Sequence, residues 1–312
     1  MIDLEQYTTL FKKLENAISW TNDRRITNAV ASFYYLNSHP FDGKRLLDMS
    51  DRLKKEGWTS YLNQTIHYIM AARLAVRQGT PDELLEELLK TYQLLLSHGF
   101  KKSMYTYLAA LYVMDYPETD LKQAYDLFVA IKSHHPFLTG AEDIPYSVLL
   151  SSQEKDPVEQ AVIMNKYYQN LKTVKLWQGN ELQWLSQVLT SDSIVYNESY
   201  IPYIAHIRNQ LKEQKIRVSL QHYVLLGMLA IDELDLEAFK QIVYTYWELT
   251  KSKLFKWYKE DALTLAILNH LSTKQDASLH QAVSANHLIQ MQQLAMLSSV
   301  NSTIQLVQSS NS

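Results

Sequence analysis

The sequence lacks cysteine and contains little glycine. None of its 312 residues is cysteine, which excludes disulfides, thiolate nucleophiles and cysteine-ligated metal clusters and is typical of proteins in a reducing compartment. Only seven residues are glycine, whereas a usual chain contains ~7%. Folds that depend on glycine-rich turns, such as dinucleotide-binding domains, P-loop enzymes and β-sandwiches, are therefore disfavoured.

An excess of one charge and long apolar runs are also absent. The chain has 30 Lys and Arg against 33 Asp and Glu, a net charge of −3 and a pI of about 6.4, whereas nucleic-acid-binding domains usually exceed pI ~9. The uncharged, predominantly apolar stretches Ser103–Met114 and Val218–Ile231 are shorter than the ~18 apolar residues that mark a membrane span. Asp3 and Glu5 stand where a secretory signal would be basic. We therefore predict a cytoplasmic protein without nucleic-acid or membrane partners.

The most informative feature present is an internal repeat of about 39 residues. Similar segments recur at spacings of 38 to 40 residues, and each has one anchor residue: Ala29, Tyr68, Tyr107, Tyr146, Trp184, Tyr223 and Leu263. Six of the seven glycines lie at the junctions between predicted helices, and only Gly227 lies inside one. Because glycine and proline destabilise helix interiors, this distribution predicts two helices per repeat.

The predicted fold is all-α, a right-handed α-solenoid or αα-superhelix of about seven helical hairpins. Helix A of each hairpin carries the anchor, and helix B is a longer amphipathic partner. One hairpin cannot bury its own apolar face, so neighbouring hairpins should stack into a continuous core. We expect residues 1–23 to form an N-terminal capping helix, residues 24–297 a single repeat domain and residues 298–312 a disordered tail.

Several blocks of sequence resemble a known family. The stretch HPFLTGAEDIPYSVLL at 135–150, together with segments 40–46, 99–110 and 179–186, is similar to an uncharacterised bacterial family with a domain of unknown function, common in Gram-positive spore-formers. The resemblance covers most of the chain. It implies a helical cytoplasmic protein and supplies no activity, so no catalytic residue can be carried over.

The densest polar cluster contains His134, His135, Glu142 and Asp143, which are residue types that bind metals. Consecutive residues on a helix or turn point about 100° apart, however, and no HxxxH or HExxH pattern is present. Glu142 is expected to close a capping box that begins at Thr139. We therefore predict neither a metal site nor a cofactor.

Polar residues also stand one and four positions before the anchors, on one side of each helix A, because residues i and i+3 are neighbours on a helix. Stacking would align them along a surface of the kind on which repeat proteins bind peptides. The alternative is an ordinary solvated first turn. The candidate partner-binding residues are Arg25, Asn28, Gln64, His67, Ser103, Thr106, Glu142, Asn180, Gln183, Ser219, His222 and Lys259. For the aromatic anchors themselves, a place in the core is favoured over a binding ladder.

Three functions follow from these patterns. A non-enzymatic helical-repeat protein with a groove for a peptide or protein partner is favoured, because catalytic and phosphate-binding motifs are absent. One alternative is an α/α-toroid enzyme, in which a closed ring would gather carboxylates for hydrolase-like chemistry: Glu142, Asp143, Glu181, Glu260 and Asp261. The other is a peptide-sensing regulator. Contact between the first and last hairpins would distinguish a ring from an open array; the sequence leaves this contact and the oligomeric state open.

Overall fold

The computed structural model describes residues 2–18, 24–56, 67–151, 155–191, 193 and 195–273. Within these ranges the chain forms fourteen α-helices, a few short 3-10 helices and no strand. The prediction of an all-α fold is therefore confirmed.

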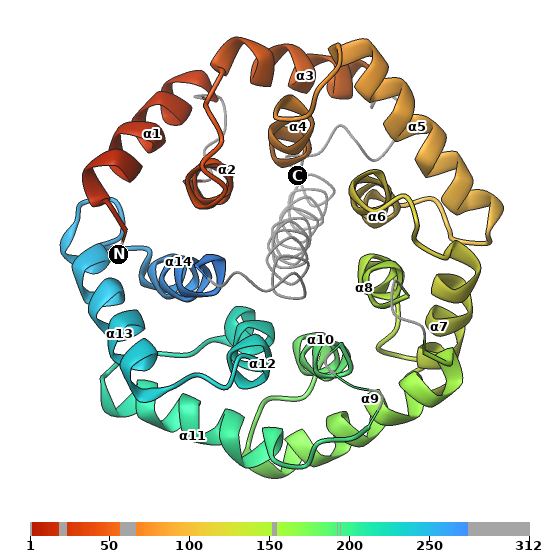
Figure 1. The fold of residues 1–312 in the computed structure, drawn as a ribbon, viewed down its shortest axis with the longest axis vertical. Helices are drawn as coiled ribbons and strands as arrows, with labels where there is room; N and C mark the ends of the chain where they lie inside the picture. The colour runs from red at the N-terminus through yellow and green to blue at the C-terminus, as the bar shows by residue number, and fades with distance from the viewer. Residues whose placement is uncertain are drawn as a thin grey trace, which may run out of the picture.

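The helices form two concentric layers (Figure 1). The outer layer consists of α1 (Leu4–Ala17), α3 (Gly43–Glu56), α5 (Pro81–Ser97), α7 (Leu121–His134), α9 (Pro157–Leu171), α11 (Tyr200–Glu213) and α13 (Leu236–Lys251). The inner layer consists of α2 (Arg24–Leu36), α4 (His67–Ala75), α6 (Met104–Asp115), α8 (Ile144–Leu150), α10 (Asn180–Leu189), α12 (Tyr223–Ile231) and α14 (Lys259–Ser272). The chain thus alternates between an outer and an inner helix around the molecule.

All seven anchors lie on inner helices. Six of them are buried, and Ala29 is half-buried against the core. The ring of Tyr146 stacks on Trp184 of the next inner helix, with 5.8 Å between their centroids. The anchor column is therefore part of the core, as the residue types favoured.

The two layers differ in the distribution of their apolar residues. In α12 every residue from Tyr223 to Ala230 is buried, and a helix that is apolar all round belongs in an interior. Outer helix α5 instead buries one face through Leu84, Leu88 and Leu95 and exposes the other. At Gly227 a Cβ atom would lie 2.6 Å from Cδ1 of Leu185 in α10, so glycine allows these two inner helices to approach closely.

The array of hairpins closes on itself (Figure 1). Helix α14 packs against α2, and Nδ2 of Asn28 donates to Oδ2 of Asp261 at 3.1 Å. In the outer layer, the ring of Tyr7 in α1 lies 5.8 Å from that of Phe255, which follows α13. An open superhelix would separate the first and last hairpins by the length of the stack. The structure therefore answers the question that the sequence left open: the hairpins form a ring.

Helix α1, which was expected to act as an N-terminal cap, lies in the outer layer beside α2 and buries Tyr7, Phe11 and Leu14. The predicted helix B after α14 and the predicted tail 298–312 lie outside the described residues. In the part of the chain that the structure describes, no helix is both long enough and apolar enough to cross a membrane.

Candidate functional site

The ring has two chemically distinct faces. Because outer and inner helices alternate, every inner helix begins on one face, called here the start face, and ends on the other, called the end face. The start face carries the residues at or just before the first turns of inner helices, among them Arg25, Ser103, Asn180, Ser219 and Lys259. The end face carries their last turns, among them Leu36, Asp115, Ile231 and Ser272.

The candidates one position before the anchors are buried between inner helices instead of forming an open row. Asn28, His67, Thr106, Gln183 and His222 are all at most 7% exposed. Three of them bond to a neighbouring hairpin: Asn28 to Asp261, Gln183 to Asp143, and His222 to the backbone of Glu260. This set of side chains therefore joins the hairpins within the fold.

Among these contacts between hairpins, the one centred on Asp143, just before α8, has the most hydrogen bonds. Its Oδ1 accepts hydrogen bonds from Nε2 of Gln183 at 2.8 Å, Nε2 of Gln187 at 3.0 Å and Nε1 of Trp184 at 3.2 Å, all in α10. Its Oδ2 accepts from the backbone N–H of Gly140 at 3.0 Å. One fully buried carboxyl group thus ties α8 to α10 through hydrogen bonds.

Burial dominates the ionisation of this carboxyl group. It raises the pKa of Asp143 to about 7, and the nearby charge of Glu142 acts in the same direction. The hydrogen bonds that favour the ionised form lower the pKa and offset part of this rise. Since the side chain is fully covered, it is unable to contact a substrate, and its role is to hold the fold.

The predicted capping box of Thr139 and Glu142 is wrong. The N-cap of the 3-10 turn Ala141–Asp143 is Gly140, so the residue that reaches back to the cap is Asp143. Glu142 is directed instead to the neighbouring repeat, where its Oε1 accepts from Nδ2 of Asn180 at 3.1 Å.

The candidates four positions before the anchors remain at the start face. Asn180 and Glu142 are brought together, as an aligned row of polar residues along the stacked helices would require. Ser103 caps α6 by accepting from the backbone N–H of Thr106 at 3.0 Å. Arg25 and Lys259 line a cavity, and Gln64 lies outside the described residues.

His222 joins the first turns of α12 and α14. Its Nδ1 accepts from the backbone N–H of Ser219 at 3.0 Å, so its Nε2 carries the proton and donates to the carbonyl of Glu260 at 3.0 Å. Burial lowers the pKa of His222, which keeps the ring neutral. The two bonds use both ring nitrogens, and His222 is therefore a structural histidine.

A cavity of about 900 Å³ opens on the start face at the closure of the ring. Its wall is built by the first turns of α2 and α14, the end of α13, the loop after α13 and the segment before α12. Among the described residues, six cationic side chains line it, against two carboxylates, Glu260 and Asp261. The cations are Arg25, Lys215, Arg217, Lys251, Lys256 and Lys259. We call this the basic cavity.

Of this lining, the sequence predicted Arg25 and Lys259 as partner-binding residues and, for the toroid alternative, Glu260 and Asp261 as candidate carboxylates. The remaining cations come from the segment before α12, the end of α13 and the loop after it, and Arg25 of α2 meets them because the ring closes. One local signal was present, because Lys251, Lys256 and Lys259 alternate with Trp257 and Tyr258 in the segment KSKLFKWYK. Both aromatic residues also line the basic cavity, together with Tyr246 and Trp247.

Three large aromatic side chains are exposed in loops that lead into inner helices. Phe137 before α8 is 100% exposed, Trp177 before α10 is 74% exposed, and Trp257 before α14 is 83% exposed. All three therefore lie on the start face. Aromatic residues are enriched in protein interfaces, and exposed apolar groups that gather on one face mark interaction sites.

The polar cluster of His134, His135, Glu142 and Asp143 is divided between different environments. His134 is exposed, whereas His135 is buried with its ring 4.6 Å from that of Tyr168. Among the residues with described positions, no group of three or more His, Asp or Glu side chains is arranged to hold a metal ion.

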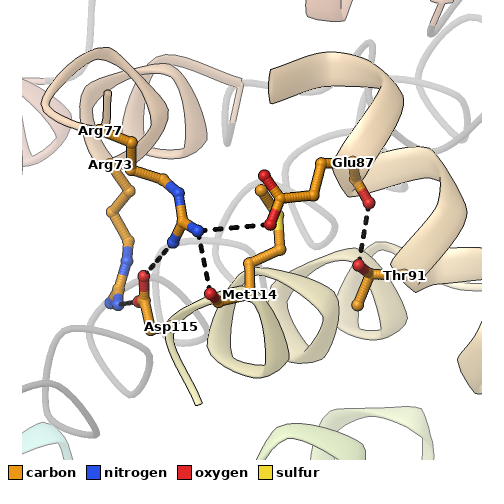
Figure 2. A network of polar contacts seen from close by, with 6 residues as sticks. All are labelled: Arg73, Arg77, Glu87, Thr91, Met114 and Asp115. Carbon is orange, nitrogen blue, oxygen red and sulfur yellow. Dashed lines mark hydrogen bonds and ion pairs between the residues drawn. The ribbon is translucent and has the colours of Figure 1, made fainter. Parts of the chain in front are cut away.

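On the end face, Arg73 and Arg77 form internal contacts (Figure 2). Asp115, the last residue of α6, forms ion pairs with Arg73 of α4 and with Arg77 just after it. Nη2 of Arg77 also donates to the carbonyl of Met114 at 2.9 Å and lies 3.4 Å from Oε1 of Glu87. Cations at helix C-termini meet the negative end of the helix dipole, so this network stabilises the contact between the inner helices.

A second cavity, of about 910 Å³, lies on the end face between α1, α2 and α14. Its charged lining is Asp3, Glu5 and Lys13, with His39 beside them. This end-face cavity flanks the same ring closure as the basic cavity but has no cationic excess.

Comparison with known proteins identifies a family but no activity. The family described as "Protein of unknown function (DUF4003)" matches residues 10–306. The uncharacterized protein YeaA of Bacillus subtilis (strain 168) is 25% identical over 285 residues, which cover 88% of this chain and 85% of YeaA. No solved structure matches this chain. The resemblance found in the sequence is confirmed: the chain belongs to the DUF4003 family of proteins of unknown function.

Proposed function

We propose that the protein is a non-enzymatic binding protein that holds a peptide or protein partner on its start face. The observation that carries this proposal is the exposure of Phe137, Trp177 and Trp257 in loops on that one face. Large aromatic side chains supply much of the binding energy at protein interfaces. Loops held by a rigid scaffold are common binding elements, and the closed ring with its buried polar joints is such a scaffold.

The environment of the start-face carboxylates supports binding over catalysis. Asp143 is covered, Glu142 accepts from Asn180, and Asp261 accepts from Asn28. General acid–base catalysis needs a carboxyl group within reach of the substrate. We also propose that the protein acts in the cytoplasm, which the lack of cysteine favours.

The proposal is tested by replacing two of the exposed aromatics. Because neither side chain is buried, the Phe137→Ser, Trp177→Ser variant should fold like the wild type. Crosslinking and affinity purification with the wild type identify a partner, and calorimetry with the purified partner then measures binding. We expect the double variant to bind at least ~10-fold more weakly, as the loss of interface aromatics usually causes.

Leu236→Ser is the matched control, since Leu236 is also a largely exposed apolar side chain, on outer helix α13. Its affinity for the partner should equal that of the wild type. Equal binding by the aromatic double variant, or the absence of any partner that binds directly after purification, would contradict the proposal.

The closed ring favours a second candidate, the α/α-toroid enzyme. Glu260 and Asp261 line the basic cavity, although adjacent helical residues point about 100° apart, and glycoside hydrolysis needs two facing carboxyl groups ~5–9.5 Å apart. A panel of oligosaccharides incubated with the wild type and with Glu260→Gln tests this candidate. Hydrolysis that the wild type performs and the variant does not would replace the binding proposal with an enzymatic one.

A further inference from the structure

The basic cavity carries an excess of charge that indicates the chemistry of its ligand. We propose that it binds an acidic peptide segment, rich in Asp and Glu and containing at least one aromatic or other large apolar side chain. This inference rests on the proposed function and narrows it, because it assigns one part of the start face to one kind of partner segment.

The first argument is the local charge. The cavity has six cations against two carboxylates in a protein whose net charge is −3. Within the described residues, the side chains of Lys215, Arg217 and Lys259 form no ion pair. Lys251 bonds to Glu248 at 2.5 Å, and Lys256 lies over the ring of Trp257, 5.5 Å from its centroid. The cavity therefore attracts anions.

The second argument is the position of these cations relative to the helices. Lys259 is the first residue of α14, and Arg25 is the second residue of α2. The N-terminus of a helix carries partial positive charge, so cations placed there are unfavourable for the fold. The same field favours a bound carboxylate. The first turn of α14 also contains Glu260 and Asp261, whereas the first turn of α2 contains no acidic residue, so a ligand carboxylate would add favourable charge chiefly at the start of α2.

The third argument is the aromatic lining. Trp257 is largely exposed and Trp247 is partly exposed at this cavity. Carboxylates alone do not require aromatic walls, whereas an apolar side chain packs well against indole rings. The lining thus fits a segment that combines negative charge with an apolar or aromatic group.

A peptide fits this cavity better than a nucleic acid strand does. Glu260 and Asp261 would repel a continuous row of phosphates, but their oxygens can accept hydrogen bonds from peptide N–H groups. A volume of about 900 Å³ suits a short segment. Beyond the cavity, the negative net charge of the protein provides no general attraction for a polyanion.

Fluorescence anisotropy with a labelled decapeptide, two copies of Glu-Glu-Phe-Glu-Asp, tests the proposal on the full chain. We expect saturable binding that weakens at least 10-fold between 50 and 300 mM NaCl. The same peptide with glutamine in place of every acid should bind at least 10-fold more weakly. Tighter binding of a ten-residue oligothymidylate than of the acidic peptide would overturn the assignment in favour of nucleic acid, and failure of the acidic peptide to bind would also overturn it.

Variants locate the binding. Arg25→Gln with Lys259→Gln should weaken peptide binding at least 10-fold, whereas Lys122→Gln with Lys240→Gln, at exposed outer-layer lysines, should leave it unchanged. Trp257→Ala should weaken it several-fold, and Trp177→Ala, in the corresponding loop before α10, should not. Circular dichroism verifies that each variant is folded. Equal losses in the test and control variants would show that the peptide binds elsewhere.

The two proposals can fail separately. If the partner from the affinity experiment binds the Arg25→Gln, Lys259→Gln variant as tightly as the wild type, the acidic-segment inference fails while start-face binding stands. If that partner also binds the Phe137→Ser, Trp177→Ser variant with unchanged affinity, the proposed function fails as well.

Discussion

The two cavities beside the contact between α2 and α14 have nearly the same volume, about 900 and 910 Å³, but opposite electrostatic character. The end-face cavity has Asp3 and Glu5 against Lys13, whereas the basic cavity has six cations against two carboxylates. Since the same closure forms both hollows, packing alone does not account for the difference in charge.

Three arginines of the end face illustrate how charged side chains stabilise this ring. Arg73 and Arg77 pair with Asp115, and Nε of Arg45 donates to the carbonyl of Ala75 at 2.7 Å at the end of α4. Each of these contacts satisfies a carboxylate or an end-of-helix carbonyl, where positive charge is favourable. In the basic cavity, by contrast, Arg25 and Lys259 are at helix starts, where positive charge is unfavourable. This contrast is the one expected if the proposed binding, and not stability, maintains Arg25 and Lys259.

The largest loss of stability is expected from substitution of Asp143. This substitution tests whether an ionisable group on the start face also stabilises the fold. Asp143→Ala removes the acceptor for three buried side-chain donors of α10 and for the N–H of Gly140. Buried donors left without partners should lower the free energy of unfolding by about 3–5 kcal/mol. Urea unfolding followed by circular dichroism measures the loss. Glu142→Ala, which removes one half-buried bond, is the control, and a similar small loss in both variants would contradict the prediction.

The pH dependence of stability gives the next largest effect. The pKa of Asp143 is about 7 in the folded protein, against ~3.9 in an unfolded chain. The folded state therefore binds this proton more tightly, and its contribution to stability is present below pH ~4 and is lost as the pH rises to about 7. Between pH 5 and pH 8 the wild type should lose about 2–3 kcal/mol more than Asp143→Asn. Parallel unfolding curves for both proteins at the two pH values would contradict this.

A smaller loss is expected from the end-face network. Asp115→Ala leaves the buried guanidinium of Arg73 without this carboxylate, and partial exposure of Asp115 moderates the cost to about 2 kcal/mol. Glu87→Ala removes only an exposed partner of Arg77 and should change the free energy of unfolding by less than ~0.5 kcal/mol. Thermal and urea unfolding of both variants measure the contrast. Equal losses would show that the ion pairs of Asp115 with the end-face arginines stabilise the fold no more than the exposed contact with Glu87 does.

The smallest effect has the opposite sign. Lys259→Glu should raise the free energy of unfolding by about 0.5 kcal/mol, because it replaces a cation with an anion at the first residue of α14. The same change should weaken binding of the acidic decapeptide more than 10-fold. Lys122→Glu, at the start of outer helix α7, is the control for peptide binding, which it should leave unchanged. Destabilisation by Lys259→Glu would show that Lys259 supports the fold, which removes the contrast between the two faces.

The helical hairpins could be predicted because their signals are local. The capping box of Thr80 and Glu83 opens α5 as the residue types require, and the anchors from Tyr68 to Tyr223 all fall on buried inner helices. Apolar spacing, caps and breakers act within one or two helical turns. These signals therefore need no knowledge of neighbouring repeats.

The candidate site shows where local signals stop being sufficient. Gln183 and His222 have the sequence pattern of polar first-turn residues, but their partners Asp143 and Glu260 lie about one repeat away along the chain. Whether such a side chain meets water or a neighbouring hairpin depends on how the repeats stack. For the same reason, the candidate residues one position before the anchors are buried in contacts between hairpins and do not form an exposed row.

By itself the sequence determined an all-α chain of repeated hairpins, the burial of the anchor helices and membership of the DUF4003 family. Only the tertiary structure decided that the hairpins close into a ring and that α1 fills a place in its outer layer. It also decided that cations from distant segments meet in one cavity. The physical reason is that curvature accumulates from small packing differences at each interface between repeats, such as the close approach at Gly227. The accumulated curvature therefore cannot be predicted from the sequence of any single repeat.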